Sequence, residues 1–235
     1  MTRHNLPWSE ACERNKQPIL DQLRVILEHE CDEIARSGGE HESGRQEGLS
    51  DRKKPIVLEI GSGTGQHVVY FSAALTHWTW QPTDRPINLD DLSLRVQMEG
   101  GANVLAPIAL DVFGVWPEQR YSAVFSANTA HIMSWRAVEA MFAGVAGCLR
   151  PAGQFILYGP FNENGRYSSV SNERFDASLK LQDPAMGLRD LVELQSLAHS
   201  VQMKLTSRRP MPANNEILVF KHETRVTDSG ETEAR

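Results

Sequence analysis

The chain has 235 residues, of which 40% are hydrophobic and 23% are charged, and its formal net charge at pH 7 is −6. This length and apolar content suit one substantial core and therefore one domain. The acidic balance offers no broad positive surface, so nucleic-acid binding is not expected. The opening residues MTRHNLPWSEACERNK hold no apolar signal core, and no stretch approaches the ~18 apolar residues of a membrane span. We therefore expect a cytoplasmic protein without membrane contact, either monomer or homodimer.

The N-terminal part of the chain predicts a helix followed by a linker. QPILDQLRVILEHECDEIA, residues 17–35, places apolar side chains at helical spacing, with Pro18 suited to the first turn. We assign residues 1–35 to an N-terminal helical cap. Residues 36–54 lose this periodicity and are rich in Gly, Ser and charge, which predicts a flexible linker. The widely spaced Cys12, Cys31 and Cys148 lack zinc-ligand spacing, so no metal site is predicted.

Residues 55–222 form the main domain in our prediction. Short, nearly continuous apolar runs alternate with helical patterns, which is typical of a doubly wound α/β fold whose mostly parallel sheet has helices on both faces. After residue 160 the pattern predicts a long polar loop, a helix around 184–199 and strands near 201–208 and 216–222. The tail at 223–235 is expected to be disordered.

The stretch VLEIGSGTGQHVVYF, residues 57–71, predicts a ligand-binding loop between a strand and a helix. Gln66 stands where a dinucleotide fingerprint needs its third glycine, and no G-K-[S/T] follows as in a P-loop. Glu59 would repel a pyrophosphate but suits a cationic ligand. S-adenosylmethionine has a sulfonium and an α-ammonium and no phosphate, and glycines permit its close approach to the backbone.

Two further acids stand at the ends of the next two predicted strands. Asp84 closes WTWQPTD, where a carboxylate can accept hydrogen bonds from both ribose hydroxyls. Asp111 closes VLAPIALDV, where it can accept from an adenine amino group while Val112 offers apolar contact. One such acid alone is usually a helix cap, but three at successive strand ends favour an adenosyl ligand.

These residues resemble the Rossmann-like, class I S-adenosylmethionine-dependent methyltransferases. LEIGSGTGQH (58–67), WQPTD (80–84), NTAHI (128–132) and YGPFNENGRYSS (158–169) are similar to the family known as domain of unknown function 938, or the methyltransferase-like protein 26 family. Ser62 stands where that family commonly has alanine. The resemblance implies a seven-stranded, mostly parallel sheet with an antiparallel final strand.

The resemblance also implies a set of cofactor-binding residues. An arginine before the first helix suits the methionine carboxylate, or else is a surface residue, and Asn15 beside it belongs to the same cap. The implied cofactor residues are Arg14, Glu59, Gly61, Ser62, Gly63, Thr64, Gly65, Asp84, Asp111, Val112 and Asn128.

The methyl acceptor is expected beside the ends of the fourth and fifth strands. His131 is a candidate general base, or else caps the following helix, and Tyr158 either points its phenol into the site or packs the strand. The long loop that starts GPFNENGRYSSVSNERFD is our candidate for substrate recognition. Its proposed polar contacts are Arg166, Asn172, Asp176 and Arg189, although Asp176 and Arg189 also suit a structural ion pair.

The sequence therefore predicts a methyltransferase that uses S-adenosylmethionine, releases S-adenosylhomocysteine and methylates an O, N or S atom of a small molecule. SANT, at 126–129, is not the N/D-P-P-Y signature, and no Pro-Cys dipeptide is present, so DNA methylation is disfavoured. Methylation of a protein or peptide side chain stays open. So does a non-catalytic protein that senses S-adenosylmethionine, and a nicotinamide enzyme is a further alternative.

Overall fold

A computed structural model describes residues 6–37 and 54–222, with side chains described outside 29–37. Seven strands form the central sheet in the order β3-β2-β1-β4-β5-β10-β9. Their bounds are β1 (Ile56–Ile60), β2 (Thr79–Asp84), β3 (Ile108–Ala109), β4 (Tyr121–Ala127), β5 (Leu149–Gly159), β9 (Met203–Met211) and β10 (Asn215–His222). The first five strands run parallel, whereas β10 is antiparallel to both β5 and β9. The expected doubly wound fold, including its antiparallel last strand, is confirmed.

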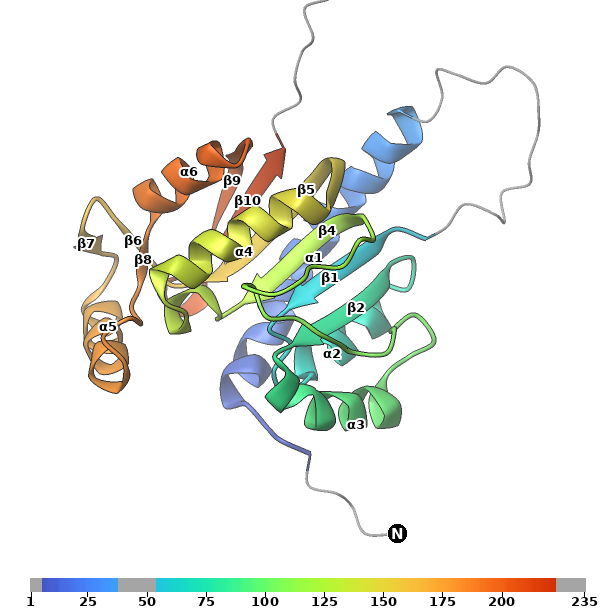
Figure 1. Ribbon diagram of the computed structural model, residues 1–235, viewed down its shortest axis with the longest axis horizontal. Helices are drawn as coiled ribbons and strands as arrows, with labels where there is room; N and C mark the ends of the chain where they lie inside the picture. The colour runs from blue at the N-terminus through green and yellow to red at the C-terminus, as the bar shows by residue number, and fades with distance from the viewer. Residues whose placement is uncertain (1–5, 38–53, 223–235) are drawn as a thin grey trace, which may run out of the picture.

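Helices cover both faces of this sheet (Figure 1). They are α1 (Glu10–Ser37), α2 (Gln66–Ala74), α3 (Leu89–Glu99), α4 (Trp135–Cys148), α5 (Val170–Gln182) and α6 (Leu191–Ser200). Short 3-10 turns are η1 (Pro86–Asn88), η2 (Ala130–Ile132) and η3 (Pro212–Asn214). No helix in the described part of the chain is both long enough and apolar enough to cross a membrane.

The core lies in two layers, one on each face of the sheet. Alternate residues of a strand point to opposite faces. In β10, Leu218 and Phe220 pack with α4 and α6, whereas Ile217 and Val219 pack with α1 and α2. Burial on both faces explains why the strands read as continuous apolar runs rather than as an alternating pattern.

The N-terminal helix starts earlier than predicted. It begins after Ser9, whose Oγ accepts a hydrogen bond from the backbone N of Cys12 at 3.4 Å, and continues through Pro18. The prediction that Pro18 lies in the first turn of the helix was therefore wrong. The helix tolerates the missing N–H because Ile19 and Leu23, which follow the proline, are fully buried. The proposed linker lies mainly, and the tail wholly, outside the described residues.

The segment after β5 is more ordered than the predicted loop. A small sheet, in the order β7-β6-β8, is built from β6 (Phe161–Glu163), β7 (Arg166–Tyr167) and β8 (Arg189–Asp190). With α5 it stands to one side of the central sheet (Figure 1). The prediction of a long polar loop was wrong. Helix α5 buries few side chains, so its sequence does not show apolar residues at helical spacing. The helix expected at 184–199 begins at Leu191, after β8.

Candidate active site

The glycine loop leaves β1 in a conformation that needs glycine. Gly61, Gly63 and Gly65 have φ values of 70°, 53° and 75°. A Cβ atom on Gly61 would lie 2.6 Å from Cγ2 of Thr129, and one on Gly65 would lie 3.0 Å from Leu92. The loop thus packs tightly on the turn after β4 and on α3, and Gly63 is its exposed residue.

Asp84 ends β2 and holds the glycine loop. Its Oδ2 accepts from the backbone N of Gly63 at 2.6 Å, and its Oδ1 accepts from the backbone N of Arg85 and from Nδ2 of Asn88, both at 2.7 Å. The side chain is buried. A carboxylate offers about four acceptor positions, so Asp84 keeps the capacity to accept from a ligand hydroxyl.

Glu59 is the most unusual group in the site. It is 2% exposed, and its Oε2 has no hydrogen-bond partner among the described residues. Burial raises the pKa of Glu59 to about 8, and the nearby charge of Asp84 adds to this rise, while a hydrogen bond from Ser62 opposes it. An unpartnered buried carboxyl costs free energy. A cationic ligand with N–H donors would supply what this group lacks.

The third strand contributes Asp111 and Val112 at the same edge of the sheet. Backbone N of Leu110 donates to the carbonyl of Asp84 at 2.8 Å, which ties the two strand ends together. Asp111 is exposed, and its Oδ1 accepts from the backbone N of Phe113 at 3.0 Å. Val112 packs against the core on the α4 face. The strand is only two residues long, shorter than predicted.

Helix α1 covers the glycine loop, and apart from Asn15, which was expected in the cap, the residues that fasten it were not predicted. Gln66 Oε1 accepts from the backbone N of Ser9 at 2.6 Å, and Arg95 Nη2 donates to the carbonyl of Pro7 at 2.7 Å. His67 Nε2 lies 2.7 Å from Oδ1 of Asn15. Burial lowers the pKa of His67 to about 4, so its imidazole is neutral at pH 7.

A cavity of about 420 Å³ opens beside the ends of β4 and β5. Asn128 and Tyr158 line it from the strands, Arg14 and Asn15 from α1, and Pro212 and Ala213 from the turn between β9 and β10. The backbone N of Asn128 donates to the carbonyl of Tyr158 at 2.9 Å. Asn128 is also the chain neighbour of Thr129, which contacts Gly61, so the cavity lies near the glycine loop, although no residue of that loop lines it.

His131 lies close by but does not line this cavity. It is buried in η2, and its ring packs edge-on against Phe175 at 5.3 Å between centroids. Burial, and to a smaller extent the charge of Arg189, lowers the pKa of His131 to about 4. The imidazole is therefore neutral at pH 7 and has the protonation state that a base requires.

Three of the four residues predicted to contact the substrate already form hydrogen bonds with other residues of the protein. Asn172 donates from Nδ2 to the carbonyl of Asn214 at 3.0 Å. Asp176 accepts from Lys180 at 2.6 Å and Tyr167 at 2.7 Å, and so pairs with Lys180 rather than with Arg189. Arg189 donates instead to the backbone carbonyls of Ala130, Met133 and Ala185. These bonds hold α5 and η2 in place.

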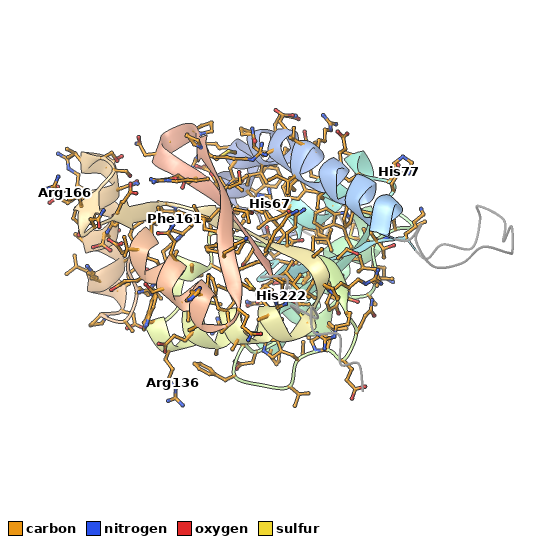
Figure 2. The ribbon with its side chains drawn as sticks, turned by 90° about the horizontal axis from the view of Figure 1, so that it is seen from above. His67, His77, Arg136, Phe161, Arg166 and His222 are labelled. Carbon is orange, nitrogen blue, oxygen red and sulfur yellow. The ribbon has the colours of Figure 1, made fainter. Side chains whose placement is uncertain are left out.

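Arg166 lies apart from the other three residues. It lines a separate cavity of about 570 Å³ together with Glu163, Tyr167 and Arg208. Figure 2 shows Arg166 at the outer end of the molecule, far from His67 at the start of α2. The structure thus does not bring Arg166 to the glycine loop. Within the described residues, no three His, Cys, Asp or Glu side chains gather as metal ligands.

Comparisons with known proteins agree with this architecture. The family model described as "Protein of unknown function (DUF938)" matches residues 43–222. An O-methyltransferase family protein from Burkholderia thailandensis superposes with a TM-score of 0.65 at 12% identity, over 91% of this chain and 61% of that one. Human N-acetylserotonin methyltransferase in complex with SAM superposes with a TM-score of 0.64 at 12% identity, over 72% of this chain and 48% of that one.

A third solved structure is similar to the same degree. The O-methyltransferase family 2 protein from Planctomyces limnophilus, in complex with apigenin, gives a TM-score of 0.64 at 14% identity, over 78% of this chain and 55% of that one. The chain spans about half to three fifths of the length of these three neighbours. At such identities the likeness shows a shared fold, that of the class I methyltransferases.

Proposed function

The chain belongs to the DUF938 family, and from this premise and its methyltransferase fold we propose that it is an S-adenosylmethionine-dependent methyltransferase acting on a small molecule. The observation that carries the proposal is the buried carboxyl of Glu59, whose Oε2 has no partner among the described residues, beside a glycine loop braced by Asp84. This combination suits a ligand with positive charge and hydroxyl groups. It does not suit a pyrophosphate, because a buried carboxyl offers no positive charge to that group.

Each part of the site has a role in holding that cofactor. Glu59 would accept from its cationic group, and the loop of Gly61, Ser62, Gly63, Thr64 and Gly65, where three residues lack side chains, would let it approach the backbone closely. Asp84 would accept from the ribose hydroxyls. Asp111 and Val112 would contact the adenine, and Asn128 the methionine part. When bound, S-adenosylmethionine supplies a methyl group activated by a positively charged sulfur, and S-adenosylhomocysteine remains after transfer.

The remaining task of the protein is to hold a nucleophile in line and away from water. Such positioning can supply much of the rate enhancement without a strong general base. Tyr158 lines the cavity beside the glycine loop and would orient the acceptor. His131, neutral at pH 7, is the second proposed catalytic residue, because a neutral imidazole can take a proton from an acceptor hydroxyl or amine.

We propose turnover rather than sensing, because the cavity extends from Asn128 past Tyr158 to Pro212 and Ala213, beyond the residues assigned to the cofactor. Here about 420 Å³ stay open between α1, the strand ends and the β9–β10 turn, which is within the usual range for small-molecule sites. Asn172, Asp176 and Arg189 do not line this cavity, and we propose that they shape the loop beside the acceptor. Arg166 lines a separate cavity and has no part in this proposal.

Calorimetric titration of the full chain with S-adenosylmethionine, S-adenosylhomocysteine and NAD tests the cofactor class. We expect saturable binding of both sulfur nucleosides and none of NAD. Binding of NAD, or of neither sulfur nucleoside, would contradict the proposal. Incubation with methyl-labelled S-adenosylmethionine and a small-molecule extract then tests transfer, because a sensor would bind the cofactor and leave every extract component unlabelled.

A further inference from the structure

The cavity beside the glycine loop presents hydrogen-bond donors and has no acidic lining. Of its polar lining side chains, Arg14 carries a positive charge, and Tyr158 and the asparagines are uncharged. No Asp or Glu is among the residues that line it. A partly enclosed space with a cation and no carboxylate favours an anionic ligand and disfavours an amine.

Arg14 can turn to contact a ligand. Among residues 6–28 and 54–222 its side chain pairs with Glu10 alone, at 3.2 Å, and the two side chains are 71% and 83% exposed. An ion pair so open to water contributes little, because water screens both charges. A carboxylate bound inside the cavity would meet the guanidinium in a less hydrated place, where a two-pronged contact is stronger.

Tyr158 adds a second donor, because its side chain lines the cavity and carries an O–H group. Burial raises the pKa of Tyr158, and the nearby Asn15 side chain opposes this rise. The phenol therefore keeps its proton at pH 7 and can donate it to an acceptor in the cavity. Asn15 is itself held by His67, whose Nε2 lies 2.7 Å from Asn15 Oδ1.

From these contacts we infer that the cavity binds a small organic acid, whose carboxylate lies between Arg14 and Tyr158. Its apolar body would rest on Pro18, Pro212 and Ala213, which line the same space. The claim that this acid is the methyl acceptor rests on the proposed function. The claim that the cavity prefers acids is independent of it. In this assignment Arg14 contacts the acceptor and not the methionine carboxylate of the cofactor.

Matched pairs of fragments test the inference by NMR titration. The probes are benzoate with benzamide, and phenylacetate with phenylacetamide, added to the full chain saturated with S-adenosylhomocysteine. We expect each acid to bind about tenfold more tightly than its amide, as one charge-assisted contact provides. Arg14→Gln should bring this ratio close to one, and Tyr158→Phe should lower it by about threefold.

The control is Arg24→Gln, which removes a similarly exposed arginine of α1 that does not line this cavity. It should leave the ratio unchanged. Equal binding of acids and amides, no binding of any probe at millimolar concentration, or a preference that survives Arg14→Gln would each overturn the inference. A large loss of S-adenosylhomocysteine affinity in Arg14→Gln would also overturn it, by assigning Arg14 to the cofactor.

The two proposals fail separately. If the wild-type chain does not bind S-adenosylhomocysteine, the proposed function fails, and the acid preference can still be measured on the free protein. If the cofactor binds and the acids show no preference, only the inference about the acceptor fails.

Discussion

The Cγ2 methyl group of Thr129 occupies the space that a side chain on Gly61 would need, because a Cβ atom there would lie 2.6 Å from it. Thr129 is held by a second contact, a 2.6 Å hydrogen bond between its Oγ1 and Oγ of Ser126, so it cannot easily move aside. This contact joins the end of β1 to the turn after β4 and fixes the path of the glycine loop.

We therefore expect Gly61→Ala to destabilise the protein and to abolish cofactor binding. The left-handed backbone at Gly61 adds about 1–2 kcal/mol of strain, and the clash adds about 1–3 kcal/mol. Unfolding in urea measures the sum. The double variant Gly61→Ala/Thr129→Ser removes the clashing methyl group. It should recover the stability lost to the clash but not the stability lost to backbone strain.

Gly147→Ala is the matched control for that series. Gly147 lies in α4, and nothing lies within 4 Å of an added Cβ atom. Alanine is the better helix former, so stability should rise by about 0.5–1 kcal/mol. Equal loss of stability in the Gly61 and Gly147 variants would show that the contact with Thr129 is not the cause.

Asp84→Asn should weaken S-adenosylhomocysteine binding by at least about 100-fold, because the amide both loses charge and presents an N–H group to the loop N–H of Gly63. Calorimetry gives the dissociation constant. Asp90→Asn, at an exposed position in the first turn of α3, is the control and should bind normally. Normal binding by Asp84→Asn would remove Asp84 from the cofactor site.

Glu59 should make cofactor binding depend on pH. Since the pKa of Glu59 in the free protein is about 8, its carboxyl is largely protonated at pH 6.5. A cationic ligand favours the ionised form, so binding should release a proton. The affinity should therefore rise by up to about tenfold for each unit that the pH is raised, until the pH reaches about 8. Titrations in buffers with different ionisation enthalpies count that proton. Glu59→Gln should release none.

The same group should make the free protein less stable at higher pH. The unfolded chain loses the Glu59 proton near pH 4.5, whereas the folded protein keeps it to about 8. Between these values the folded state binds the extra proton, so the free energy of unfolding falls by up to ~1.4 kcal/mol per pH unit. Measurements from pH 7 to 8.5 should show this fall in wild type and in the exposed control Glu139→Gln. An equal fall in Glu59→Gln would assign it to another group.

His67 and His131 should act in the opposite direction at low pH. Burial lowers the pKa of both to about 4, so between pH 6.5 and 4 the unfolded chain takes up protons that the folded protein does not. The free energy of unfolding should therefore fall as the pH drops through this window. His67→Gln and His131→Gln should each flatten the fall, and the exposed control His77→Gln should not.

The proposed catalytic role of His131 needs a separate readout. If His131 is a general base, His131→Gln should lower kcat by about 10²-fold and leave S-adenosylhomocysteine affinity unchanged. His77→Gln should keep wild-type kcat. An unchanged kcat in His131→Gln, measured with the labelled methyl group, would leave His131 with only its packing against Phe175.

Sequence reasoning found the parts of the site that depend on local chemistry. The glycine loop and Glu59 were predictable because the end of a strand, glycines at alternate positions and a nearby acid all stand within a few residues of one another in the sequence. Asp84 was predictable because successive parallel strands end at one edge of the sheet. Their ligand remains a proposal, whereas their positions around one loop follow from the fold.

Contacts between distant segments could not be read in this way. Thr129 against Gly61, and Asn15 beside His67, arise from packing across the sheet and carry no motif. Helix α5 was missed because it buries little, although Asp176 and Lys180 have the i, i+4 spacing of a helical ion pair. This spacing made the helix predictable from the sequence.

The bonds that fasten α1 also bear on how the protein reaches its folded state. They join Pro7 to Arg95, Asn15 to His67 and Ile26 to Gln154, pairs separated by 88, 52 and 128 positions. On the ribosome, α1 therefore emerges well before its partners, and it cannot complete its contacts until β10, which also packs against it, has been made. Until then its apolar face, with Ile19 and Leu23, has no sheet to cover, and this stretch of the nascent chain is where a chaperone would have most to bind.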